Sequence, residues 1–481
     1  MKREIRLHIF RHIWLQTGAA VAMKATATIA YIVLLTAITT IPAAAADLTF
    51  ENTGATGLNP VKVEAQATTG LEAVYVLPEF NAMTTVRFPA DGGAAASSAK
   101  WSCFSNLGGG FAEPVASRTE GNMSVINLAT VPGITNQKGI GFIVEYGGRQ
   151  HCYWLVNYAH NACTLGSLTM APEQECDRTA LIFDGHAEKI TYYSINGVAQ
   201  TLSRDMELTY NTLAYDEERR QYVQDEISHT LEFADAVIRV EAPLCNTQFA
   251  LSTDRFKREW GQNEEIFSPE FTTQAIAATT YATQAERSND NEQREDKAPL
   301  GGSGPAEITF TAEVTDAVVY KEWQFARDQQ FDVIDLRIQE LEVTHTFRDY
   351  GTNYVRFVAG NDSGSCDYIS ETYEVYIGES RLECPNAFSP GATEGTNDEW
   401  KVSYKSIIEF DCHIFNRWGL EMAHLTDPSQ GWDGRHKGKL VPSGVYYYVI
   451  KAKGSDGQDY KLSGDINILK YSNDSSTNGT R

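Results

Sequence analysis

The last hundred residues, from Cys384 to about Tyr471, constrain the fold most, because they repeat short aromatic-rich segments between turn residues. The segments are NAFSPGATEGTND (386–398), IFNRWG (414–419), GWDG (431–434) and PSGVYYYVIKAKGSDG (442–457). Gly, Pro, Asn and Asp favour turns, whereas Val, Ile, Tyr and Phe favour strands. The pattern predicts a small β-sandwich.

Side-chain patterns place individual strands in this region. Apolar and polar residues alternate from Ile408 to Ile414, which predicts a strand with one buried face. The segment Val445–Ile450 is apolar on both faces and predicts a central strand. The Asp-Gly pair at 456–457 tolerates the positive backbone angles of a hairpin turn, so a further strand is expected at 460–469.

The order and spacing of these blocks resemble the gliding-motility-associated C-terminal domain of Bacteroidetes, the type B sorting signal of the type IX secretion system. The resemblance covers residues 381–481. It implies two partners, the type IX outer-membrane machinery and a companion outer-membrane barrel protein. The residues that carry the motif are Asn386, Phe388, Pro390, Asn397, Asp398, Phe415, Asn416, Arg417, Trp418, Gly419, Trp432, Asp433, Gly434, Gly444 and Tyr446.

One block departs from the family pattern, which usually reads NAFSPNGDGxND. Here Gly391–Thr396 separates Pro390 from Asn397 and Asp398. The carboxylate and amide groups that could hold calcium in the usual version are therefore thinned out. We expect no metal and no other cofactor.

Residues 1–46 predict a secretory signal peptide. Basic residues lie within Lys2–Arg11, an apolar run follows at Ile29–Ile41, and Ala43–Ala46 supplies a small-residue cleavage site. The run is about thirteen residues long, short of the roughly twenty that a membrane span needs. An uncleaved anchor is the alternative, and Met23 could replace Met1 as initiator. We expect export across the inner membrane, then an outer-membrane surface or extracellular location.

Three more β-domains are expected between these ends, so the fold class is all-β with tandem sandwiches. Residues 47–160 and 161–262 each predict an immunoglobulin-like β-sandwich. Residues 263–380 resemble a polycystic-kidney-disease-type (PKD) immunoglobulin-like repeat through the blocks YKEWQF, HTFRDYGTNYVRFVAGNDSGSC and YEVYI. Within that domain, residues 284–304 hold charges, amides, Gly and Pro, and predict a solvated loop.

The eight cysteines follow a predicted secretion signal and show no C-x-x-C spacing, which favours structural disulfides over zinc. One pair is expected in each of three sandwiches. Cys163 and Cys366 have no assigned partner. The expected pairs are Cys103–Cys152, Cys176–Cys245 and Cys384–Cys412.

No motif indicates catalysis. His151–Cys152 is followed by Tyr153 and Trp154 on an expected strand, an inert setting for a thiol. G-x-S-x-G and H-E-x-x-H are both missing from the sequence. The net charge of −23 argues against a nucleic-acid partner. Trp418 and Trp432 each lie near a turn glycine, and burial of either ring is expected to anchor the terminal domain.

The function expected is that of an exported, non-enzymatic cell-surface protein, adhesive or structural, with a surface glycan or another protein as ligand. Two alternatives stay open. One is a component or sensor of the type IX secretion machinery itself. The other is a surface hydrolase with a divergent catalytic domain within residues 47–260.

Overall fold

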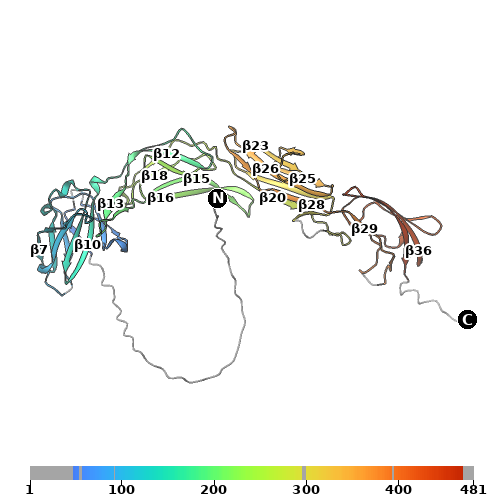
Figure 1. The fold of residues 1–481 in the computed structure, drawn as a ribbon, viewed down its shortest axis with the longest axis horizontal. Coiled ribbons are helices and arrows are strands. Elements are labelled where there is room, and N and C mark those ends of the chain that lie inside the picture. Colours follow the sequence, from blue (N-terminus) through green and yellow to red (C-terminus); the bar gives the residue numbers. More distant parts are fainter. Residues whose placement is uncertain (1–46, 54–56, 92, 295–298, 393–394, 470–481) are drawn as a thin grey trace, which may run out of the picture. The chain divides into compact units, whose positions relative to one another are not determined.

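The computed structural model describes residues 47–53, 57–91, 93–294, 299–392 and 395–469. The predicted signal peptide at 1–46 lies outside these residues. Strands make up nearly all the regular structure of the described chain, which confirms the all-β fold class (Figure 1). Its helical elements are α1 (Arg255–Glu259) and the 3-10 turns at Ala67–Thr69, Ala96–Ser98, Leu128–Thr130, Ile134–Asn136 and Tyr158–His160. Among the described residues, no helix is long and apolar enough to cross a membrane.

Residues 49–157 form two sheets. The smaller has the strand order β1 (Thr49–Glu51), β4 (Thr85–Pro89), β8 (Met123–Asn127) and β7 (Ser117–Glu120). The larger has the order β2 (Val61–Glu64), β3 (Ala73–Leu77), β10 (Arg149–Asn157), β9 (Gly139–Tyr146), β5 (Lys100–Phe104) and β6 (Glu113–Val115). β3 and β10 are parallel, and the other pairs are antiparallel.

Residues 164–267 form three antiparallel sheets. Their strand orders are β11 (Thr164–Met170), β12 (Arg178–His186) and β17 (Val237–Glu241); β13 (Ile190–Tyr193) and β14 (Ala199–Leu202); and β16 (Gln221–Leu231), β15 (Met206–Asp216), β18 (Ala250–Ser252) and β19 (Glu265–Phe267). Side chains from both sides of residues 160 and 161 share one hydrophobic core, which contains Trp154 of β10 and Leu208 of β15.

Residues 278–377 have a separate core around Trp323 and Phe310. One sheet has the order β20 (Ala278–Gln284), β22 (Ala306–Val314) and β25 (Glu342–Phe347). The other has the order β21 (Leu300–Gly302), β28 (Tyr373–Ile377), β26 (Gly351–Gly360), β23 (Tyr320–Ala326) and β24 (Leu336–Ile338), with β27 (Asp367–Ile369) also paired to β26.

The C-terminal region is built on one five-stranded sheet. Its order is β30 (Ala387–Phe388), β37 (Asp459–Ile468), β36 (Gly444–Gly454), β32 (Ile407–Phe415) and β33 (Glu421–Leu425). Two short ladders accompany it: β29 (Arg381–Glu383) with β31 (Ser403–Lys405), and β34 (Arg435–His436) with β35 (Lys439–Leu440). The predicted hairpin turn after β36 is present, with Gly457 at φ +78°.

Two details of this sheet differ from the sequence predictions. β36 is central by its hydrogen bonds, yet it buries one face, because Val445, Tyr447 and Val449 stay exposed. On β32, the register shifts between Ile407 and Glu409, so Ile407 takes the deeply buried place and Ile408 is half-buried. A bulge of this kind moves one extra residue out of the alternation. The exposed side of β32, β33 and β36 is called the outer face below.

The polar segment at 284–304 is not a solvated loop over its described part. The Asn291 carbonyl accepts the Tyr404 amide at 3.0 Å, and the Gln293 amide donates to the Tyr404 carbonyl at 2.7 Å. The Asn291 side-chain amide donates to the carbonyls of Val402 and Pro428, both at 2.8 Å. The Glu292 side chain is 1% exposed and pairs with Arg287 at 2.8 Å. The segment thus docks on the C-terminal region as an extra edge of β31.

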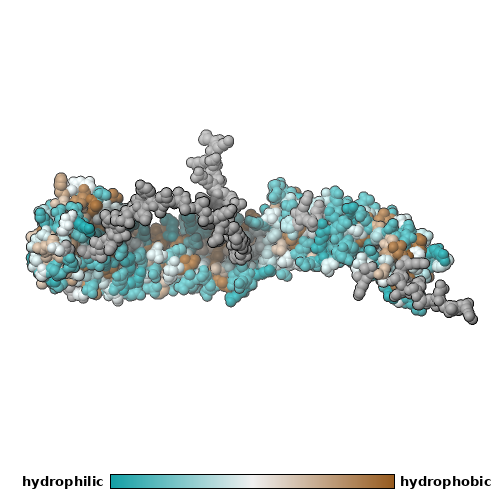
Figure 2. Space-filling view, turned by 90° about the horizontal axis from the view of Figure 1, so that it is seen from below, coloured by the Kyte–Doolittle hydropathy of each residue, from teal (hydrophilic) through white to brown (hydrophobic). Residues whose placement is uncertain are grey.

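The surface agrees with the acidic composition. On the face in Figure 2, hydrophilic residues cover most of the area and hydrophobic residues are dispersed among them. With a formal net charge of −23, such a surface favours solubility and disfavours binding to polyanions.

Candidate functional site

Trp432 is the aromatic anchor of the C-terminal core, as predicted. Its side chain is 2% exposed, and its indole N–H donates to the Arg435 carbonyl at 3.0 Å. Its ring packs against Phe388 and Tyr446, with centroids 5.5 and 5.2 Å away. Its backbone partner Trp400, which no sequence motif marked, exchanges two hydrogen bonds with Trp432 and is fully buried.

Other motif residues form the loop before Trp400. A Cβ on Gly434 would lie 3.1 Å from Pro390 Cγ and 3.3 Å from Phe388 Cζ, so glycine lets both side chains pack there. The Asp398 carboxylate accepts the amides of Gly391 and Gly395 at 2.8 and 2.7 Å. Asp398 therefore closes its own loop by hydrogen bonds to the backbone.

The remaining motif residues have local backbone roles. Asn386 accepts the Asn467 amide at 2.9 Å, and Asp433 accepts the Arg435 amide at 2.9 Å. Tyr446 donates its hydroxyl to the Pro442 carbonyl at 2.9 Å. Asn397 has φ +55°, and Gly444 begins β36.

Trp418 is not buried, which corrects the prediction made from its neighbouring glycine. Its side chain is 76% exposed. It lies in the turn between β32 and β33, where Asn416 Oδ1 accepts the amides of Trp418 and Leu420, both at 3.0 Å. Gly419 completes the turn at φ +81°, a conformation that favours glycine. The glycine thus serves the turn and does not make room for a buried ring.

The exposed turn borders a groove of about 400 Å³. Arg417 lies over the Trp418 ring at 4.2 Å, and both line the groove with Pro442, Val445 and Tyr446. Cation–π stacking and the Asn416 hydrogen bonds hold the turn in one conformation. The motif residues therefore fall into three groups: buried residues that build the core, such as Phe388, Pro390 and Trp432, residues with local backbone roles, and an exposed turn, 416–420, that the core does not need. Phe415, half-buried at the end of β32, leads into this turn.

The predicted Cys103–Cys152 disulfide is wrong. Cys103 on β5 pairs with Phe142 of β9, and Cys152 on β10 pairs with Ile143 of β9. One strand therefore separates the two cysteines, and neighbouring residues of β9 face opposite sides of the sheet. Two strand spacings amount to roughly 9.5 Å, beyond the reach of a disulfide. Burial raises the pKa of the Cys152 thiol to about 11, with Glu72 adding to the effect, so this thiol is inert.

The Cys176–Cys245 prediction is also wrong, because Cys176 is bonded to Cys366. The two Cα atoms lie 5.5 Å apart, and the residues are 190 positions apart in sequence. Cys176 precedes β12 and Cys366 precedes β27, so the bond joins the sheets of residues 164–267 to those of residues 278–377. The predicted pairs all lay within single sandwiches, and Cys366 had no predicted partner.

The predicted Cys384–Cys412 bond is not formed either, and both residues are free thiols among the described residues, as are Cys163 and Cys245. The two thiols are near each other: burial first, and then the neighbouring Cys384, raise the pKa of Cys412 to about 12. The Cys384 thiol instead interacts with the Tyr448 hydroxyl.

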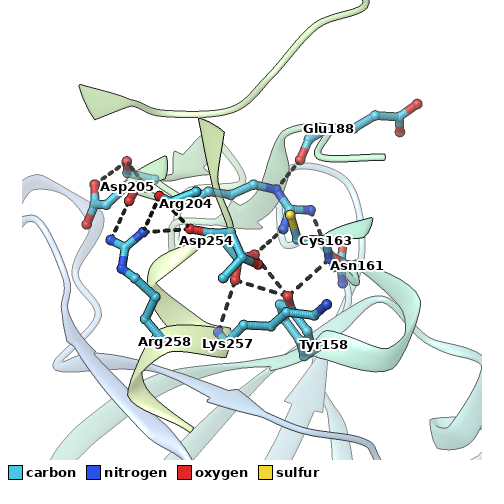
Figure 3. Close-up of polar contacts among 12 residues, drawn as sticks. Tyr158, Asn161, Cys163, Glu188, Arg204, Asp205, Asp254, Lys257 and Arg258 are labelled. Atoms are coloured by element: carbon cyan, nitrogen blue, oxygen red, sulfur yellow. Dashed lines mark hydrogen bonds and ion pairs between the residues drawn. The ribbon is translucent and has the colours of Figure 1, made fainter. Parts of the chain in front are cut away.

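A buried polar cluster joins residues 158–163 to the sheets of residues 164–267 (Figure 3). Arg204 and Asp254 are 1% and 0% exposed and form an ion pair at 2.6 Å. Asp254 also accepts the Tyr158 hydroxyl at 3.0 Å and caps α1 by accepting the Lys257 amide at 3.1 Å. Arg204 donates to the carbonyls of Glu188 and Asn161, each at 2.7 Å. The charged groups are fully partnered away from solvent, so the cluster serves the fold.

Comparisons with known families agree with this division of the molecule. Residues 382–468 match the CHU_C type IX secretion signal domain. Residues 168–268 match a fibronectin type III domain. The chain is thus a tandem β-sandwich protein that carries a type IX secretion signal domain after a fibronectin type III domain. Both matched domains are of non-catalytic kinds. No curated protein sequence matches the chain.

Solved structures with similar folds are distant. A tetra-tandem repeat from the extending region of a large adhesion protein is 11% identical, covers 82% of this chain and 98% of its own, and has a TM-score of 0.20. The FN1–FN3 domains of chicken CNTN1 are 14% identical, with coverages of 64% and 100% and a TM-score of 0.21. Fibronectin(III)-like modules of Clostridium thermocellum CbhA are 12% identical, with coverages of 39% and 94% and a TM-score of 0.17.

Proposed function

We propose that this chain is an exported cell-surface protein, adhesive or structural, whose C-terminal domain is read by the type IX outer-membrane machinery through the turn 416–420 and its groove. The secretion signal match at 382–468 supports export to the surface or the extracellular space. The observation that carries the recognition step is Trp418, a large aromatic side chain kept 76% exposed on a hydrogen-bonded turn. Exposed aromatic anchors beside a groove are typical of protein interfaces.

The rest of the chain supports an adhesive or structural role. Residues 168–268 match a fibronectin type III domain, which is a non-catalytic kind of module. We propose four sandwich domains with the boundaries predicted from the sequence, 47–160, 161–262, 263–380 and 381–481, and with the third domain PKD-like. The second boundary moves from 262 to a position after Phe267, because β19 pairs with β18. The separate cores of residues 278–377 and 382–468 support the last two boundaries. A glycan or protein ligand of the sandwiches and a companion outer-membrane barrel belong to the same proposal.

The test compares export of variants in a bacterium that has the type IX system. Trp418→Ala should leave the protein folded but reduce its amount at the cell surface, with processed chain accumulating in the periplasm. The matched control is Phe111→Ala, which removes a 92% exposed aromatic ring far from residues 382–468 in sequence and should be exported normally. Deletion of residues 382–481 should trap the whole chain.

The two levels of the proposal fail separately. Normal export of Trp418→Ala, together with trapping of the deletion variant, would move recognition to another surface of the domain. Normal surface display of the deletion variant would refute the sorting role.

A further inference from the structure

Two histidines and two carboxylates converge on the outer face of the C-terminal sheet, and none of the four lines the groove. His413 on β32 lies directly opposite His424 on β33, and Asp411 precedes His413 by two positions on the same face. The imidazole rings are stacked 4.2 Å apart at an angle of 7°. One ligand atom each from Asp411, His413 and His424 lies within 4.8 Å of the others.

The hydrogen bonds orient these side chains toward one point. Glu421 Oε2 lies 3.0 Å from His413 Nδ1, and a carboxylate can only accept, so Nδ1 carries the proton. His413 Nε2 then carries the lone pair that a metal ion can bind, and it lies 3.4 Å from Asp411 Oδ1. His424 Nε2 lies 2.6 Å from the same oxygen and donates its proton there in the metal-free protein, so a metal would bind the other tautomer of His424, with the proton on Nδ1. Both imidazoles thus present Nε2 to one carboxylate oxygen.

We propose that Asp411, His413 and His424 form a binding site for a divalent transition-metal ion such as Zn²⁺, with Glu421 positioning His413. Zinc takes imidazole nitrogen at about 2.0–2.1 Å and carboxylate oxygen at about 2.0–2.2 Å, which sets tetrahedral ligands roughly 3.5 Å apart. The separation of His413 Nε2 from Asp411 Oδ1, 3.4 Å, already matches this spacing, whereas that of His424 Nε2 from the same oxygen must widen from 2.6 Å. The Glu421–His413 contact is the carboxylate–histidine arrangement that fixes the tautomer of metal ligands.

The surroundings suit a surface site with an open coordination position. Asp411, His413 and His424 are between a third and a half exposed, so solvent can supply the fourth ligand. Lys451 of β36 is in register with Asp411 and is the nearest cation by strand pairing. Bound metal would tie β32 to β33 and so stabilise the hairpin that carries the turn 416–420. The site is independent of the proposed sorting role and differs from the calcium loop considered for residues 391–396.

Isothermal titration of the metal-free full chain, carrying no polyhistidine tag, with ZnCl₂ tests this site. We expect one saturable site at pH 7.5 and a loss of affinity of about 10- to 100-fold or more in His413→Asn, His424→Asn and Asp411→Asn. Binding should vanish at pH 5, because a protonated imidazole cannot coordinate. Calcium should not compete, since it prefers all-oxygen ligands.

The matched control is His186→Asn, which removes an exposed histidine elsewhere and should bind zinc as the parent does. The melting temperature of each variant in EDTA shows whether that variant is folded. If one histidine variant does not fold, the zinc affinity of the other tests the site. The proposal is overturned if no saturable zinc binding occurs, or if the affinity is unchanged in both His413→Asn and His424→Asn. Equal binding of calcium at the same residues would also overturn it.

Discussion

Trp418 and Trp432 show that similar local sequences can place the same residue type in opposite surroundings. Each is followed within two positions by a glycine, yet one ring is exposed and the other buried. The difference is set by hydrogen bonds of the neighbours. Asn416 accepts two amides and turns the chain outward, whereas Trp432 is held in a backbone ladder with Trp400. The glycine signal alone could not separate these cases.

Replacing each tryptophan with alanine should therefore have very different effects on stability. Trp432→Ala removes a buried aromatic ring from a small core and should lower the free energy of unfolding by about 3–5 kcal/mol. Trp418→Ala removes an exposed ring, and its free energy of unfolding should stay within about 0.5 kcal/mol of that of the parent. Urea denaturation of the two variants, followed by circular dichroism, measures both values. Equal destabilisation would contradict the assigned burial.

The buried ion pair of Arg204 and Asp254 leads to a second stability prediction. Arg204→Met leaves the Asp254 carboxylate buried without its partner charge and should lower the free energy of unfolding by about 3–5 kcal/mol. The double variant Arg204→Met/Asp254→Asn removes both charges and should cost less than the sum of the single changes. A double-mutant cycle from urea denaturation measures the coupling. Additive single costs would mean that the two side chains act independently.

Buried thiols and phenols should make the protein less stable in alkali. Burial raises the pKa of Cys152 to about 11 and, with Glu292 adding, that of Tyr404 to about 12. In the unfolded chain these groups ionise near about 8.5 and 10. Above pH 8.5 the unfolded state therefore binds fewer protons than the folded state, so the free energy of unfolding falls as pH rises toward 12.

This pH dependence can be measured by denaturation between pH 8 and 11. Cys152→Ala removes one titrating group and should reduce the slope of unfolding free energy against pH, whatever its effect on stability at pH 8. Cys245→Ala serves as the comparison. Burial also raises the pKa of this thiol, but Cys245 is only partly buried, so its removal should change the slope less than Cys152→Ala does. A slope unchanged by Cys152→Ala would mean that this thiol ionises normally in the folded protein.

At the scale of elements, apolar–polar alternation predicted the strands that bury one face. It did not predict features that have no apolar face. The hairpin β15–β16 pairs residues 206–216 with 221–231, and its outer half is largely polar, so alternation marks only its inner half. The register shift on β32 was likewise invisible, because a bulge leaves the residue pattern intact while it changes which side chain faces the core.

The polar segment 284–294 was misread for the same reason. Its stability comes from backbone and amide hydrogen bonds to residues 402–404 and 428, which composition does not report.

We expect the Tyr404 amide, which donates to the Asn291 carbonyl, to exchange slowly with deuterium. Asn291→Ala removes two side-chain hydrogen bonds that hold the segment and should speed this exchange. The matched change Asn211→Ala on β15 should leave it unaltered, and fast exchange in the parent would contradict the docking.

At the scale of the whole molecule, the family resemblance located the secretion signal domain, and alternation gave the fold class. The disulfide pairing could not be predicted, because it depends on how two regions meet. The predicted pairs assumed that both cysteines of a disulfide lie in the same sandwich. Cys176 and Cys366 instead lie in loops of different regions, 190 residues apart, and neither loop marks its partner in the sequence.

The Cys176–Cys366 bond predicts a covalent link that survives cleavage of the chain. Non-reducing peptide mapping of the secreted protein should find these two cysteines joined and Cys245 free. A protease cut at any site between 177 and 365 should leave the two fragments joined on a denaturing gel until reductant is added. The reason is that the disulfide joins residues on opposite sides of the cut. Cys366→Ser should let the fragments separate without reductant, whereas Cys245→Ser should not. Recovery of a Cys176–Cys245 peptide would contradict the structure, since a cut between 246 and 365 would then release the C-terminal fragment at once.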